Sequence, residues 1–393
     1  MRLEVTPDRI EVGQRPGDLR AHWAHGNGPG VASNFVESPV RTLGLLIDWR
    51  HVSGSARETR QGSGVMRAVV FDRAAPDASA SRVAEVPLPE PGPGQIAVDV
   101  AYAGINFIDV MARRGDPGYA SEWPFVPGLE IAGTVRALGA GVERPARGAR
   151  VAAFVGRGGL AEVALAPAAL VAEVPDDVDL ARAAAAGGAL TTAALLLEHV
   201  ARVRRGEVVL VHSAAGGVGQ ALAQLAPLCG AARIVGTVGR PERVESARAA
   251  GYDAVLVRNE NLAPALREQT GGRGADVILD PQGTDLLELD VELAAPGARI
   301  VLYGNAAGGT LGPLPPAGAL FAGNLMIGGF SLSRMSSQLP DRVASALRDV
   351  LVRLADHQID VELHELDGLD AAPHAHDELA AGLGSGKRVV RVT

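Results

Sequence analysis

The feature that most restricts the fold of this chain is the segment 208–213, apolar from Val208 to Val211, which leads directly into a glycine-rich turn. The turn, Ala214-Ala215-Gly216-Gly217-Val218-Gly219, has the pattern A-x-G-x-x-G and continues into apolar residues at helical spacing. A small first residue permits the tight turn, the middle glycine lets the backbone approach a pyrophosphate, and the last lets helix and strand pack closely. Amides at the helix N-terminus then bind the phosphates. The pattern predicts a dinucleotide site, with phosphate-binding residues Ala215, Gly216, Gly217 and Val218.

The chain after this turn favours the dinucleotide interpretation over a simple turn. Beyond about residue 189, apolar strands alternate with helical stretches, which is typical of parallel βαβ units. We predict strands at 207–212, 233–238, 254–257, 276–280, 299–303 and 325–330. These strands complete a doubly wound Rossmann sheet, so the predicted fold class is α/β. Pro227 is expected to stop or kink the helix after the turn early.

The chain before residue 189 has a different rhythm. Short strand-like runs at 95–102, 131–138, 150–154 and 160–165 are separated by Gly and Pro, which indicates a compact β-barrel lobe. After residue 330, a helical stretch at 341–357 and a strand at 388–392 are too few for a third core. We therefore expect a barrel domain at 66–189, a nucleotide-binding domain at 190–325, and a segment at 326–393 that rejoins the barrel domain.

Residues 1–65 differ from everything that follows them. They are rich in Gly, Arg and Ser and mix charges without a period, whereas residues 66–71 open a clean strand pattern. They also lack the apolar core of a secretory signal peptide. Our hypothesis is a disordered or misannotated N-terminal extension, with Met66 as the start of the folded protein and of translation. A regulatory extension is the alternative.

Composition excludes several classes of function. The formal net charge of −8 argues against a nucleic-acid-binding surface. Cys229 is the one cysteine of the chain, so an internal disulfide and a cysteine-rich zinc site are ruled out, which fits a reducing compartment. The most apolar run, 183–197, falls short of the roughly 20 strongly apolar residues of a membrane span. We predict a cytoplasmic protein that does not interact with membranes.

The end of the second nucleotide-domain strand favours NADPH over NADH. An enzyme that binds NAD usually carries an Asp or Glu there, which binds the ribose 2′-hydroxyl. This chain instead has Gly239 at that place, followed by Arg240 and Arg243, which suit a 2′-phosphate. The alternative is that both arginines are solvated residues at a helix start, with Glu242 and Glu245 as neighbours.

With these features in place, the chain from Met66 to its C-terminus resembles the zeta-crystallin-like quinone oxidoreductases, which are zinc-independent medium-chain dehydrogenases/reductases. Residues 104–115, which begin with Gly-Ile-Asn-Phe-Ile-Asp and end with Arg114-Gly115, are similar to the family segment G-x-N-x-x-D-x-x-x-R-x-G. Residues 127–133 are similar to its P-G-x-E-x-x-G segment, and 190–192 and 303–305 fit as well. The resemblance implies a GroES-like β-barrel catalytic domain followed by a Rossmann NADP-binding domain.

The resemblance also implies roles for individual residues. Asn106 would lie near the nicotinamide as the candidate catalytic residue, and the further cofactor contacts would be Thr191, Gly239, Arg243, Asn305 and Ser331. Gly239 and Arg243 would cradle the 2′-phosphate. Each position has a structural alternative: Asn106 as a turn cap, Thr191 as a helix N-cap and Asn305 as a left-handed turn residue.

The same resemblance predicts that no metal is bound. Zinc-dependent relatives carry Cys where Asn106 stands and His where Leu129 stands, and neither an amide nor an isobutyl group replaces those ligands. His374 and His376 form a short His-x-His that is expected to be incidental. Asp109 is expected to be a structural hydrogen-bonding partner. Members of the family that this chain resembles often carry a Tyr shortly after the Arg-Gly pair. Here Asp116-Pro117-Gly118 separates Arg114-Gly115 from Tyr119, so the identity of any catalytic acid stays open.

These features predict hydride transfer from NADPH to a small quinone, enone or enal. The substrate oxygen would be polarised by Asn106 or a backbone amide, and water would supply the proton. Two alternatives stay open: an enoyl-thioester reductase, and a non-catalytic NADPH-binding structural or redox-sensing protein. The resemblance alone implies a homodimer, formed by joining the edges of two Rossmann sheets.

Overall fold

The computed structural model describes residues 64–120 and 122–393. The extension predicted for residues 1–65 lies outside this part of the chain except for Gly64 and Val65. Val65 already belongs to the first strand, β1 (Val65–Phe71), which pairs antiparallel with β2 (Ser81–Pro87). The strand predicted to open at Met66 is thus present and begins one residue earlier.

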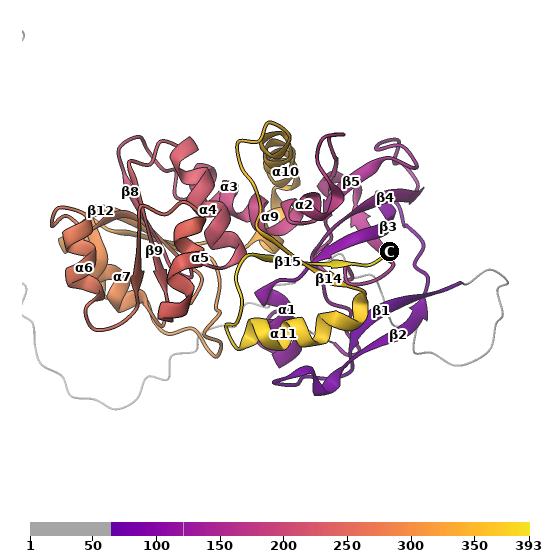
Figure 1. The fold of residues 1–393 in the computed structure, drawn as a ribbon, viewed down its shortest axis with the longest axis horizontal. Coiled ribbons are helices and arrows are strands. Elements are labelled where there is room, and N and C mark those ends of the chain that lie inside the picture. Colours follow the sequence, from indigo (N-terminus) through magenta and orange to yellow (C-terminus); the bar gives the residue numbers. More distant parts are fainter. Residues whose placement is uncertain (1–63, 121) are drawn as a thin grey trace, which may run out of the picture. The chain divides into compact units, whose positions relative to one another are not determined.

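The barrel lobe is built around a seven-stranded sheet with the order β14-β15-β3-β4-β5-β7, in which β6 also pairs with β3. Its strands are β3 (Gln95–Gly104), β4 (Glu130–Leu138), β5 (Arg150–Phe154), β6 (Val163–Pro167), β7 (Val171–Glu173), β14 (Leu363–Asp367) and β15 (Lys387–Arg391). β15 lies antiparallel to β3, so the end of the chain returns to the lobe with which the described part begins (Figure 1).

The nucleotide lobe is built around a six-stranded parallel sheet with the order β10-β9-β8-β11-β12-β13. Its strands are β8 (Val208–Val211), β9 (Arg233–Val238), β10 (Ala254–Val257), β11 (Ala275–Asp280), β12 (Ala294–Leu302) and β13 (Met326–Gly329). This is the doubly wound order, so the α/β fold class is confirmed. β11 is buried along its whole length, and its middle residues, Val277-Ile278-Leu279, form the apolar run that is typical of a strand covered on both faces.

Helices cover both faces of the parallel sheet (Figure 1). Apolar residues of α4 and α5 join the core on one face, and those of α6 and α7 join the core on the other. The helices are α1 (Phe107–Arg114), α2 (Leu180–Ala184), α3 (Thr191–Leu195), α4 (Gly217–Leu228), α5 (Val244–Ala249), α6 (Leu262–Gln269), α7 (Leu287–Leu293), α8 (Ala317–Gly323), α9 (Leu332–Gln338), α10 (Pro340–Ala355) and α11 (Ala372–Ala380).

The apolar run at 183–197 is helical but irregular. Two π turns, η4 (Ala186–Leu190) and η5 (Leu196–Val200), interrupt it on either side of α3. Within the described residues, no helix combines the length and the apolarity that crossing a bilayer requires. π turns are rare and are often found at functional sites, so η4 is relevant to the site described below.

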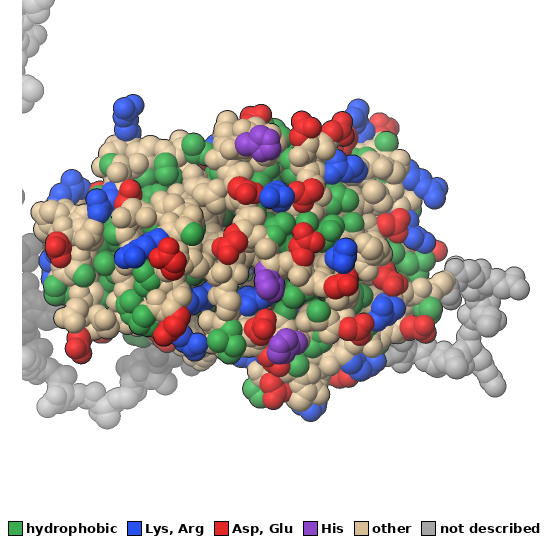
Figure 2. Space-filling model, viewed as in Figure 1, with side chains coloured by type: hydrophobic (Ala, Val, Ile, Leu, Met, Phe, Trp, Pro, Cys, Tyr) green, Lys and Arg blue, Asp and Glu red, His purple; other side chains and the backbone are tan. Residues whose placement is uncertain are grey.

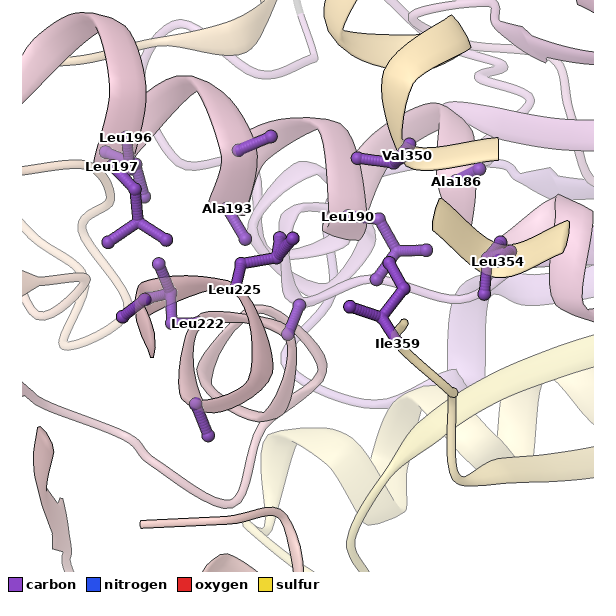
Figure 3. Packing of buried hydrophobic residues seen from close by; sticks show 14 of the residues in the cluster. Ala186, Leu190, Ala193, Leu196, Leu197, Leu222, Leu225, Val350, Leu354 and Ile359 are labelled. Atoms are coloured by element: carbon purple, nitrogen blue, oxygen red, sulfur yellow. The ribbon is translucent and has the colours of Figure 1, made fainter. Parts of the chain in front are cut away.

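Helix α4 is held against this irregular segment by close apolar packing. Leu225 of α4 lies toward Ala193 and Leu190, and Leu222 lies toward Leu197 (Figure 3). Pro227 lies in the last turn of α4, and the helix ends one residue later, at Leu228. The proline therefore lies at the end of the helix and does not interrupt its middle. This packing fixes the N-terminus of α4, and with it the glycine-rich turn, beside η4.

Candidate active site

The glycine-rich turn lies at the carboxyl end of β8 and leads into the N-terminus of α4. Gly216 is the N-cap of the helix, and Ser213 turns the chain with a positive φ of 58°. A Cβ at Gly219 would lie 2.5 Å from the carbonyl oxygen of Ser213, so only glycine fits there. The first-turn N–H groups of a helix lack intrahelical acceptors, which makes the turn suitable for phosphate. All four predicted phosphate-binding residues, 215–218, lie in this turn.

The end of β9 is lined by an arginine that the sequence interpretation missed. A Cβ at Gly239 would lie 3.0 Å from Nη2 of Arg258, which directly follows β10. Arg243 takes another direction: its Nη2 donates to the carbonyl oxygen of Gly384 at 2.7 Å and to that of Ala215 at 3.4 Å. The predicted residues Gly239 and Arg243 therefore have different neighbours: Arg258 lies next to Gly239, whereas Arg243 contacts Gly384 and the glycine-rich turn.

Three arginines in this region keep buried N–H groups without a hydrogen-bond acceptor among the described residues. These groups are Nε of Arg243, Nη1 of Arg258 and Nε of Arg388. Burial, followed by repulsion from Arg388 and Arg240, lowers the pKa of Arg243. Burial also lowers the pKa of Arg388 against the opposing effect of Glu378, whose carboxylate is 3.8 Å away. Buried or half-buried cations with unused, buried donors suit a bound anion, and phosphate oxygens match guanidinium geometry.

Asn106 lies at the junction of the barrel lobe and the glycine-rich turn. It is the N-cap of α1 in a capping box, with its backbone N–H donating to Asp109 at 2.8 Å. Its side-chain Nδ2 donates to Oε1 of Glu130 at 2.7 Å and more weakly to the carbonyl oxygen of Gly104 at 3.4 Å. Its Oδ1 accepts from Nζ of Lys387 at 2.8 Å. The cap role and a role in the site are thus compatible.

Asp109 has the structural role expected of it. Besides the bond from Asn106, its carboxylate accepts the backbone N–H of Gly128 at 2.9 Å, and the side chain is buried. It therefore joins α1 to the segment before β4.

Lys387 and Glu130 form a buried ion pair beside Asn106. Their side chains are 3% and 0% exposed, and Nζ lies 2.5 Å from Oε1. Nζ also donates to the carbonyl oxygen of Ile105 at 2.7 Å. Cδ of Lys387 would lie 3.3 Å from a Cβ at Gly217, so the lysine chain packs against the glycine-rich turn. Neither residue was predicted as part of the site.

The second oxygen of Glu130 binds the π turn. Its Oε2 accepts the N–H groups of Gly188 at 2.6 Å and Ala189 at 3.3 Å. Thr191, predicted to contact the cofactor, follows directly and is completely buried, with Oγ1 donating to the carbonyl oxygen of Ala186 at 2.6 Å. It is the first residue of α3, whose N-cap is Leu190, so Thr191 is not the N-cap and its hydroxyl is already used by Ala186.

Two other predicted cofactor residues use their side chains locally. Nδ2 of Asn305 donates to the carbonyl oxygen of Gly309 at 2.9 Å, and its backbone is not among those with positive φ. Oγ of Ser331 accepts the N–H of Arg334 at 3.3 Å and so caps α9. Neither makes a side-chain hydrogen bond with Asn106, Lys387 or Glu130 in the described part of the chain.

The space around Leu129 and Gly188 is filled by neighbouring side chains. A Cβ at Gly188 would lie 2.7 Å from Cδ1 of Leu129 and 2.8 Å from Oε2 of Glu130, so the space is closely packed. Within residues 64–120 and 122–393, no group of three or more His, Cys, Asp or Glu side chains is arranged to hold a metal ion. His376 packs edge-on against Phe71 with ring centroids 5.6 Å apart.

A polar row lies beneath the carboxyl edge of the parallel sheet. The buried His212 imidazole contacts Oγ1 of Thr237 at 2.7 Å through Nδ1 and Oδ1 of Asp290 at 2.8 Å through Nε2. Burial and the neighbouring Asp290 raise the pKa of Asp280, at the end of β11, to about 7, while His212 and Arg258 lower it. The carboxyl ends of the strands, where a dinucleotide would bind, are thus underlain by the buried side chains of His212, Asp280 and Asp290.

Comparison with known proteins supports this arrangement. Residues 92–176 match the alcohol dehydrogenase GroES-like domain family, and residues 217–348 match the zinc-binding dehydrogenase family. The chain is 35% identical over 250 residues to a 2-haloacrylate reductase of Burkholderia sp., covering 62% of this chain and 74% of that protein. It is 33% identical over 311 residues to a quinone oxidoreductase of Pseudomonas aeruginosa, covering 77% and 92%. The GroES-like assignment of the barrel lobe is confirmed.

Solved structures extend the likeness over most of the chain. The Escherichia coli quinone oxidoreductase solved with NADPH has a TM-score of 0.75 at 28% identity, covering 83% of this chain and 99% of that chain. A mycobacterial protein solved with NADPH has a TM-score of 0.75 at 33% identity, with the same coverage. Although residues 217–348 match the zinc-binding dehydrogenase family, the side chains of Asn106 and Leu129 cannot ligate zinc.

Proposed function

Because the chain belongs to the zinc-independent medium-chain dehydrogenase/reductase family, we propose that it is an NADPH-dependent oxidoreductase acting on a quinone or an α,β-unsaturated carbonyl compound. The observation that carries the cofactor choice is the set of buried, unused donors on Arg243, Arg258 and Arg388. No carboxylate side chain stands at Gly239, where an NAD enzyme usually has one. When bound, the nicotinamide would supply the hydride that the protein itself lacks.

The proposed binding roles follow the geometry. The amides of Gly216, Gly217 and Val218 would hold the pyrophosphate, with Ala215 below them in the turn. Gly239 leaves room for a 2′-phosphate beside Arg258. Asn106 and Thr191 would bound the nicotinamide end, together with Asn305 and Ser331 as predicted.

In the reaction, the chain would orient the two partners and stabilise charge on the substrate oxygen. One N–H of Asn106 is held tightly by Glu130, whereas the other makes only the 3.4 Å contact with Gly104. That second N–H, or a backbone amide, is the proposed donor to the oxygen. Water would supply the proton, since no side-chain acid has been identified.

Several finer points belong to the same proposal. The domains are taken to run as predicted, 66–189, 190–325 and 326–393. The protein is proposed to be cytoplasmic and homodimeric, with a small-molecule substrate. On the face drawn in Figure 2, acidic and basic side chains alternate over the described residues, which favours neither a nucleic acid nor an anionic membrane as partner.

The test is a spectrophotometric screen that follows NADPH and NADH consumption with five acceptors. These are 1,4-naphthoquinone, phenanthrenequinone, crotonaldehyde, 2-chloroacrylate and a crotonyl thioester. Arg258→Ala should raise KM for NADPH about tenfold or more and leave KM for NADH within about twofold, because a lost guanidinium–phosphate contact matters only to the phosphorylated cofactor. Arg348→Ala, which changes an exposed arginine of α10, is the control.

Three results would contradict the proposal. Equal efficiency of NADH and NADPH, unaffected by Arg258→Ala, would refute the 2′-phosphate pocket. The crotonyl thioester as the best acceptor by far would assign the enzyme to enoyl-thioester reduction. Tight NADPH binding without consumption by any acceptor would favour a structural or sensor protein.

A further inference from the structure

The buried group of Lys387, Glu130 and Asn106 determines how the asparagine amide is oriented. A lysine ammonium can only donate hydrogen bonds, and a carboxylate can only accept them. The amide oxygen must therefore face Lys387, and the amide nitrogen must face Glu130, at the 2.8 Å and 2.7 Å distances given above. A flipped amide would place two donors together and two acceptors together. The ion pair thus selects one orientation of Asn106.

The same pair braces two further segments of the proposed site. Glu130 holds the π turn through Gly188 and Ala189, immediately before Thr191. The aliphatic chain of Lys387 supports Gly217, the first residue of α4. The α1 N-cap, the π turn and the glycine-rich turn are distant in sequence, and this one pair contacts all three. Replacement of either residue of the pair should therefore change the position of all three segments.

Stability alone gives little reason for burying this pair. Desolvation of two charges opposes their attraction, and neutral replacements of buried pairs are often as stable as the original. Removal of one partner is different, because it leaves an uncompensated buried charge. Stability and positioning can therefore be separated by comparing single variants with a neutral double variant.

We propose that Lys387 and Glu130 are a positioning pair: they fix the amide of Asn106 and the π turn in the arrangement that brings nicotinamide and acceptor together. The proposal rests on the proposed NADPH-dependent function. Neither side chain is proposed to touch the substrate, since the donors of Lys387 are used by Ile105, Asn106 and Glu130.

The experiment compares Lys387→Met, Glu130→Gln and the double variant with the wild type. The measurements are Tm, the Kd for NADPH, the fluorescence of bound NADPH, and kcat and KM with the best acceptor. A matched control is the double variant Arg299→Met/Glu207→Gln, which neutralises a pair with 12% and 15% exposed side chains in the nucleotide lobe. Lys387→Arg tests whether a cation alone restores function.

Both single variants should lower Tm, and the neutral double variant should regain most of that loss. In all three, kcat should fall about tenfold or more while KM for the acceptor changes less than about threefold, because orientation is lost and not substrate affinity. The fluorescence of bound NADPH should also change, since its nicotinamide would meet a reoriented amide. Lys387→Arg should recover part of kcat. The control pair should leave kcat within about twofold.

Recovery of kcat together with Tm in the double variant would overturn the proposal and leave the pair a structural role. Unchanged fluorescence of bound NADPH in every variant would overturn it as well. Failure of the proposed function is distinguishable, because it would appear as a wild type that consumes no NADPH with any acceptor. In that case the fluorescence and Kd of the variants still decide whether the pair positions the bound nucleotide.

Discussion

Asp280 is the residue whose ionisation has the clearest consequence for stability. It is completely buried at the end of β11, its Oδ1 accepts the N–H of Gln282 at 2.7 Å, and its Oδ2 has no hydrogen-bond partner in the described part of the chain. The groups that act on it are Asp290, His212 and Arg258, of which Asp290 raises its pKa and the other two lower it. Burial is the largest cause of its pKa of about 7.

We expect Asp280→Asn to become more stable than the wild type as pH rises. The folded pKa of about 7 lies above the ordinary 3.8, so the folded protein holds this proton more tightly than the unfolded chain. The corresponding stability is complete below about pH 4 and is lost as pH rises through 7. Asparagine keeps the shape and the bond from Gln282 without the charge. The expected gain at pH 8 is about 1–3 kcal/mol.

Urea unfolding of both proteins between pH 5 and pH 8 measures this difference. The exposed substitution Asp349→Asn on α10 is the control and should show no trend. A constant difference between Asp280→Asn and the wild type over this range would mean that the buried carboxyl does not titrate there.

At the residue scale, the sequence was sufficient to locate the glycine-rich turn at the carboxyl end of β8. It was not sufficient to identify the side chains that surround this turn. Arg243 was visible because it follows a recognisable strand end. Arg258 was missed, although the doubly wound order places the end of β10 next to the end of β9, so the first residue after β10 was available as a candidate. Lys387 was missed because its partners, Asn106 and Glu130, are more than 250 residues away in sequence.

At the scale of elements, periodicity predicted most strands because buried parallel strands are short apolar runs between polar breaks. β5, β9 and β10 have the predicted bounds. β12 instead begins at Ala294, ahead of the predicted residue 299, because Gly297 with φ of 84° carries the chain through an irregular register. The π turn η4 was not predictable, since its N–H groups bind the carboxylate of Glu130, which lies on β4 and is distant in sequence.

The glycine-rich turn gives a prediction about an element. In Gly219→Ala the new Cβ would lie 2.5 Å from the carbonyl oxygen of Ser213 and 2.6 Å from that of Ala214, so backbone must move. We expect a loss of about 2–4 kcal/mol in stability and at least about tenfold weaker NADPH binding. Chemical denaturation and calorimetric titration measure the two effects.

Gly318→Ala is the matched control for this substitution. Gly318 lies in α8, and a Cβ there would have no heavy atom within 4 Å. Alanine should be neutral or stabilise by about 0.5–1 kcal/mol, because it restricts the unfolded chain and suits a helix. If Gly219→Ala bound NADPH as tightly as Gly318→Ala, the close helix–strand contact would not be needed for the nucleotide.

At the scale of the whole molecule, one edge of the parallel sheet carries exposed apolar residues. β13 is the edge strand and pairs only with β12 among the described strands. Met326 on β13 is 58% exposed, Phe321 on α8 is 80% exposed, and Leu311 and Leu314 in the preceding loop are also exposed. An unpaired strand edge flanked by large apolar side chains is suited to pairing with another copy, and isologous contacts of this kind close into dimers.

We therefore expect the purified protein to be a dimer and Phe321→Asp to be a monomer, because an aspartate at the contact would bury a charge in an apolar interface. Light scattering coupled to gel filtration gives the mass of each. Leu228→Asp is the control: Leu228 is 48% exposed at the C-terminus of α4, away from the β13 edge, and its replacement should leave the mass unchanged.

Since the proposed site lies within a single chain, the Phe321→Asp monomer should keep its NADPH affinity within about threefold. A wild type that is already monomeric would refute the edge contact. A monomer that loses NADPH binding would instead mean that the second copy helps to build the site.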